Sequence, residues 1–180
     1  MKSFLAATHF RKFLGTAMLA LLSVFPTALN AADSASELSV QFDVGRAGPR
    51  AIESLTERAI VRDYRSAWMS LAEAVESNNG DLLETPFAGD AKRVLHETVI
   101  SQQRSGLHQR YLNQSHKLEA VFYAPEGDVM ELHDTAEYEQ QVFDGSKSIQ
   151  DQHVVVHYVV LMTPSSDRWV VRQLQVVPQF

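Results

Sequence analysis

Two stretches of the chain repeat their apolar residues at spacings of three and four, the period of a helix with one buried face. The first stretch predicts a helix over residues 51–77, ended by Asn78-Asn79-Gly80. The second predicts a helix over residues 90–105, ended by Gly106. The apolar face of the first helix carries Ile52, Leu55, Ala59, Ile60, Tyr64, Ala67, Trp68, Leu71, Ala74 and Val75.

From Lys117 the apolar period changes to two, which is typical of strands. Turn-forming residues divide this region into four strands, over about residues 117–122, 129–142, 153–163 and 168–177. The third strand is apolar on both faces apart from two histidines, so we place it in the centre of the sheet. Residues 107–114 are ambiguous. Helices followed by a four-stranded meander predict an α+β fold with an antiparallel sheet.

The first 32 residues have the composition of a secretory signal. Their only charges are three basic residues, an uncharged apolar stretch follows over residues 13–25, and small residues lead to Ala32. A membrane span needs about 20 apolar residues, so this stretch is short for one. We expect residues 1–32 to be a signal peptide cleaved after Ala31 or Ala32, which would leave a periplasmic or extracellular chain without a membrane span. The alternative is an uncleaved membrane anchor.

The remaining chain divides into a lead-in and one domain. Residues 33–50 are small and polar, with glycine and proline, and we expect a flexible lead-in to a single domain over residues 51–180. Removing the three basic residues of the signal leaves 13 basic and 22 acidic residues, a net charge of −9. This balance argues against a nucleic-acid partner. The chain has no cysteine, which excludes disulfides, thiolate metal sites and a cysteine nucleophile.

The order of the elements resembles a known superfamily. A long aromatic-bearing helix ahead of an antiparallel sheet, and a last strand that opens Asp167-Arg168-Trp169-Val170-Val171, are similar to the nuclear transport factor 2-like (SnoaL-like) superfamily. The placement of all helices before the strands is most similar to the intermembrane domain of plastid-division proteins. The resemblance implies a cone, with the first helix across a curved four-stranded sheet. It implies no single activity, since isomerases, cyclases, dehydratases and non-catalytic modules share this fold.

Enzymes of this superfamily commonly hold an acid or base inside the cone, where apolar surroundings shift its pKa. The weak catalytic candidates here are Asp134, Tyr64 and Tyr138. Asp134 interrupts an apolar, core-facing row of the second strand, where a carboxylate is costly unless it is paired or functional. The alternative is a bulge or twist that turns Asp134 to solvent or to a backbone amide. No Asp–His pair at diagnostic spacing accompanies it, so catalysis has no independent support.

Two surfaces could bind a partner or ligand. The cone could form a pocket for a small apolar ligand, although the same aromatic side chains could instead fill the core. Beyond the catalytic candidates, the pocket-lining candidates are Trp68, Phe122, Tyr158 and Trp169. The outer face of the third strand could bury against a second copy or another protein, through Val155, Val159 and Leu161.

The histidines do not predict a metal site. His153 and His157 would lie about 13 Å apart on a strand, too far to share one ion. We expect both on a solvated outer face, where they pair with glutamates of the second strand. A metal site assembled from His133 and a glutamate is a minor alternative. The remaining histidines of the mature chain, His96, His108 and His116, are expected to be exposed. We expect no metal and no cofactor.

The sequence therefore favours an exported, non-catalytic domain that binds another protein or a second copy of itself. The alternative is a small-molecule carrier, or a SnoaL-like isomerase, cyclase or dehydratase that uses the cone cavity.

Overall fold

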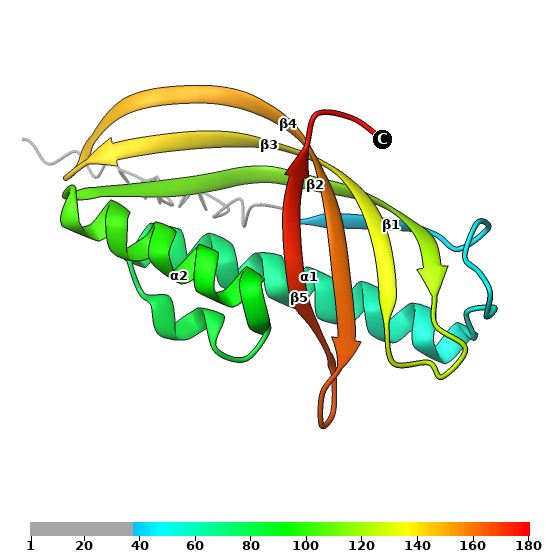
Figure 1. Cartoon of the computed structure of the whole chain (residues 1–180). Helices are drawn as coiled ribbons and strands as arrows, with labels where there is room; N and C mark the ends of the chain where they lie inside the picture. Colours follow the sequence, from blue (N-terminus) through cyan, green and yellow to red (C-terminus); the bar gives the residue numbers. More distant parts are fainter. Residues whose placement is uncertain (1–37) are drawn as a thin grey trace, which may run out of the picture. The chain divides into compact units, whose positions relative to one another are not determined.

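Two helices and a short 3-10 helix form one layer of the protein, and a five-stranded sheet forms the other (Figure 1). The structure, a computed structural model, describes residues 38–180, so the predicted signal peptide over residues 1–32 lies outside the described residues. The helical elements are α1 (Ser54–Ser77), η1 (Gly80–Leu83) and α2 (Gly89–Arg104). The strands are β1 (Ser39–Asp43), β2 (Leu107–Tyr123), β3 (Met130–Asp144), β4 (Lys147–Pro164) and β5 (Trp169–Val177).

Both helices lie on one side of the sheet, and each ends close to the residue that its sequence predicts. α1 stops at Asn78, whose φ of 55° is left-handed and whose backbone N–H donates to a carbonyl of the last turn. Its apolar face is buried under the sheet, including Ile60 and Leu71. Within residues 38–180, no helix is long and apolar enough to cross a membrane.

The α+β class is confirmed, but the sheet has five strands and is mixed. The strand order is β1-β2-β3-β4-β5, with β1 parallel to β2 and every other pair antiparallel. The prediction of a four-stranded antiparallel sheet was wrong because it treated residues 33–50 as a flexible lead-in. Val40 and Phe42 of this segment pack against the core while their neighbours are exposed, which is the pattern of an edge strand.

The middle three strands extend beyond the two outer ones. β1 pairs only with Ser115–Glu119, and β5 pairs only with His157–Pro164. The sheet therefore continues at one end as three strands alone, over residues 107–112, 139–144 and 147–153, which we call the sheet arm. The ambiguous residues 107–114 form the start of β2, and Asn113 interrupts the pairing there with a φ of 52°. The sheet curves over the helices, so its concave face meets them and its convex face points away (Figure 1).

Candidate functional site

Three polar side chains contact one another in the middle of the core, where none of them is exposed to solvent. The hydroxyl of Tyr64 on α1 donates to Oδ2 of Asp134 on β3 at 2.7 Å. Nδ1 of His116 on β2 lies 2.8 Å from the same oxygen. All three residues are completely buried. The structure thus brings together two of the catalytic candidates and adds a histidine that we expected to be exposed.

This cluster is closed off by aromatic rings. The Trp68 ring packs on His116 with centroids 4.3 Å apart, and Tyr64 meets His116 edge-on at 5.6 Å. Burial and the neighbouring Asp134 charge raise the pKa of the Tyr64 hydroxyl well above its usual value. Nε2 of His116 and Oδ1 of Asp134 are buried without a hydrogen-bond partner among the described residues. The cluster is therefore a sealed polar network rather than an open active site.

A recess of about 170 Å³, lined in part by Trp68, lies between the helices and the concave face of the sheet. Its polar lining includes three tyrosine hydroxyls. Burial raises the pKa of Tyr111, Tyr138 and Tyr158. The recess is lined by Trp68, Leu71, Val75, Val94, Leu95, Thr98, Tyr111, Tyr138, Tyr158, Leu174 and Val176.

The tyrosine hydroxyls of this recess are hydrogen-bond donors at neutral pH. Tyrosines with raised pKa values stay protonated at neutral pH, so they donate hydrogen bonds and do not act as bases. Asp134 and His116 do not line the recess, whereas Trp68 lines it and also packs on His116. Among residues 38–180, no cluster of three or more His, Asp or Glu side chains could hold a metal ion.

Two predicted pocket residues lie elsewhere. Phe122 is 39% exposed and lies on the convex face, because a register shift between Ala120 and Phe122 turns it away from the core. Trp169 is partly buried and packs against Tyr123, at 6.3 Å between ring centroids, rather than lining the recess. Of the predicted pocket set, Trp68, Tyr138 and Tyr158 do line the recess.

The three interface candidates lie on the convex face of β4, where their neighbours Val160 and Met162 point into the core. Val155 is 56% exposed, whereas Val159 and Leu161 are partly covered.

Side chains of the adjoining strands and the C-terminal residue border this row. Leu161 pairs across the strands with Glu131 and Gln173, and Glu131 in turn pairs with Phe122. The Phe180 ring stacks on His133 of β3 at 4.1 Å and meets His157 of β4 edge-on at 5.1 Å. We call the apolar residues of this face the convex patch: Phe122, Val155, Val159, Leu161 and Phe180.

Of the two histidines of β4, His153 makes the expected contacts with glutamates of β3, whereas His157 contacts a threonine. Nδ1 of His153 lies 3.0 Å from a carboxylate oxygen of Glu139, and its Nε2 lies 3.3 Å from Glu137. Nδ1 of His157 lies 3.1 Å from the hydroxyl of Thr135. These are cross-strand pairs between neighbouring strands. The prediction about His116 was wrong, since its ring lies entirely inside the core.

Comparisons with known proteins bear on the fold alone. No family model matches the chain, and no curated protein matches it. The crystal structure of the intermembrane space region of the chloroplast protein ARC6 is similar, with a TM-score of 0.56 at 15% sequence identity. The match covers 72% of this chain and 98% of that one. It supports the layout resemblance seen in the sequence.

Proposed function

We propose that this protein is an exported, non-catalytic binding domain that associates with a second copy of itself through the convex patch. The observation that carries the proposal is the apolar row of Val155, Val159 and Leu161 on the face of the sheet away from the helices. Apolar side chains grouped on one open face favour burial against another surface. Export rests on the signal-like residues 1–32, and the match to an intermembrane space region is compatible with it.

The charges around the patch favour a second copy. A two-fold axis along β4 would place β3 of each copy over β5 of the other. On this face Glu131 of β3 and Gln173 of β5 both pair with Leu161, so they lie at the same level along β4. Carboxylates of one copy would therefore meet amide donors of the other, and like charges would not face each other.

The core gives no support to a catalytic alternative. Asp134 and His116 have no solvent contact, and the hydroxyls that do line the recess have raised pKa values. A general acid or base must reach the proton that it transfers, directly or through one water. Binding is therefore the function that these groups fit.

The test is the subunit count of the purified mature chain, measured by native mass spectrometry and light scattering. The wild type should be a dimer, and Val159→Glu should be a monomer because it places a carboxylate at the centre of the apolar contact. Met69→Glu is the matched control, since Met69 is 59% exposed on α1 and should leave the dimer intact. A monomeric wild type, or a Val159→Glu variant that remains a dimer, would contradict the proposal.

A second candidate function is the transport of a small neutral ligand in the tyrosine-lined recess. The observation that favours it is the volume of about 170 Å³, since an engineered apolar cavity of about 150 Å³ binds benzene. Phenol, a single ring with one oxygen, is a suitable probe. Phenol should quench the fluorescence of Trp68, and Leu95→Trp, which fills the recess, should abolish that binding. Equal binding by both proteins would exclude this function.

A further inference from the structure

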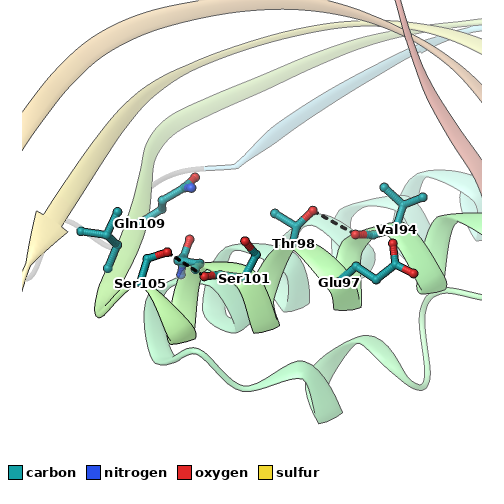
Figure 2. A pocket seen from close by; sticks show the side chains of 8 residues that line it. Val94, Glu97, Thr98, Ser101, Ser105 and Gln109 are labelled. Carbon is teal, nitrogen blue, oxygen red and sulfur yellow. Dashed lines mark hydrogen bonds between the residues drawn. The ribbon is translucent and has the colours of Figure 1, made fainter.

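A second, larger groove lies between α2 and the start of β2, with a volume of about 480 Å³ (Figure 2). One wall is the α2 face that carries the hydroxyls of Thr98, Ser101 and Ser105. Thr98 and Ser105 donate to carbonyls of their own helix, at 2.9 and 3.0 Å, so their oxygens remain able to accept. The other wall carries Gln109 of β2, which Figure 2 shows above this helix face. Apart from Val94, Glu97 and Leu107, the groove is thus lined by uncharged hydrogen-bonding groups.

The most buried residue of the groove has an unused acceptor. Gln102 is 7% exposed, and its side-chain nitrogen donates to the Val75 carbonyl and to Asn78 at the end of α1. These bonds fix the amide, while its Oε1 is buried and has no donor among the described residues. A buried acceptor without a partner costs about 1–3 kcal/mol.

Four glutamines on the concave face of the sheet arm, Gln109 among them, form a chain of amide hydrogen bonds. Gln150 donates to Gln152 at 2.8 Å, Gln152 donates to Gln140 at 2.7 Å, and Gln140 donates to Gln109 at 2.6 Å. We call this chain the glutamine ladder. It crosses from β4 over β3 to β2, a width of about 10 Å at the usual strand spacing. The ladder extends the uncharged surface of the groove across the arm.

We propose that the groove and the glutamine ladder bind a neutral oligosaccharide. Each amide presents a donor and an acceptor side by side, which suits neighbouring hydroxyls of a sugar ring. The helix wall offers the hydroxyl oxygens of Thr98, Ser101 and Ser105 as further acceptors. The ladder spans roughly the length of a disaccharide, about 10 Å.

Other ligand classes fit these groups less well. The one carboxylate that lines the groove, Glu97, is paired with Arg93 at 3.0 Å, so a charged ligand finds no net countercharge. The apolar lining is limited to Val94 and Leu107, which is too little for a hydrocarbon chain. An extended peptide would bind along a free strand edge, whereas the ladder is formed by side chains on a sheet face.

The proposal is tested with chitotetraose and cellotetraose as probes, titrated calorimetrically into the full mature chain. At least one of them should bind. Gln140→Leu breaks two links of the ladder and should weaken binding at least about tenfold. Gln141→Leu is the matched control, because Gln141 is the next residue of β3 and lies on the opposite face, so its affinity should equal that of the wild type.

Ser101→Phe is a second variant that keeps the proposal testable if Gln140→Leu does not fold. Ser101 is exposed on α2, so the change should leave the helix intact while it blocks the groove and abolishes binding. The proposal is overturned if neither probe binds at millimolar concentration, or if Ser101→Phe binds as the wild type does. Binding of an uncharged Ser-Val repeat peptide in place of both sugars would also overturn it.

Discussion

At the scale of single residues, Asp134 is the group on which the core depends most. Its Oδ2 accepts from Tyr64 and contacts Nδ1 of His116, and none of the three is exposed. Water cannot reach the Tyr64 hydroxyl or the His116 ring, because both are completely buried. Their shared hydrogen-bond partner is the Asp134 carboxylate. These contacts indicate that Asp134 holds α1 against β2 and β3.

Replacement of Asp134 should therefore lower stability strongly. Asp134→Ala leaves two buried polar groups without an acceptor, and we expect a loss of about 3 kcal/mol in the free energy of unfolding. Asp134→Asn, which keeps an acceptor for Tyr64, should lose less. Chemical denaturation measures both, with the exposed Asp151→Ala as a control that changes stability by less than about 0.5 kcal/mol. A loss for Asp134→Ala as small as that of the control would contradict the assignment.

The buried tyrosines should make the folded protein less stable at alkaline pH. Burial raises the pKa of four of the five tyrosines in the folded chain: Tyr64, Tyr111, Tyr138 and Tyr158. In the unfolded chain the same groups ionise near pH 10, so the free energy of unfolding should fall once the pH rises past about 10. Tyrosinate absorbance followed together with circular dichroism tests this. Ionisation of these four groups while the native spectrum persists would disprove it.

The burial of some of these residues could be predicted from the sequence, whereas that of others could not. Asp134 stood out because it broke an apolar row. His116 was missed because the predicted strand began at Lys117, although the alternation of Leu118 and Ala120, carried one step back, places position 116 on the inner face. Phe122 followed the same alternation and was misplaced, since the register shift after Ala120 depends on pairing with β3.

At the scale of elements, helices that depend on local sequence were easier to predict than strands that pair with distant parts of the chain. α2 was predicted over residues 90–105 and spans Gly89–Arg104, because its period and its terminal glycine lie in one short segment. β1 was not predicted, because its partner on β2 is far away in the chain and its own five residues lie close to glycine and proline. The glutamine ladder also went unnoticed, since its members come from three strands.

The contribution of β1 can be measured directly. Phe42 packs against the core from the edge of the sheet, so Phe42→Asp should detach β1 and cost about 2 kcal/mol of stability. Hydrogen exchange should then accelerate at the β2 amides that face β1, within Ser115–Glu119, while α2 keeps its protection. Gln41→Asp, at an exposed position of the same strand, is the control. Unchanged exchange in β2 would show that β1 does not protect this edge.

At the scale of the whole molecule, the curved sheet separates two surfaces. The convex patch faces away from the helices, whereas the groove and the glutamine ladder lie on the concave side with them. The two proposals are therefore independent. Val159→Glu should be monomeric and still bind a tetrasaccharide as the wild type does, and Ser101→Phe should remain a dimer. Loss of both properties in either variant would indicate that the two faces are coupled.

The parallel pairing of β1 also has a consequence for the order of folding. β2 to β5 are neighbours in the chain and form hairpins, but β1 must wait for a partner about 70 residues further on, which makes its closure entropically costly. β1 is therefore expected to dock last. Before β1 docks, the Ser115–Glu119 edge of one newly made chain can pair with β1 of another chain. The two molecules would then fold as a domain-swapped dimer that has exchanged its β1 strands.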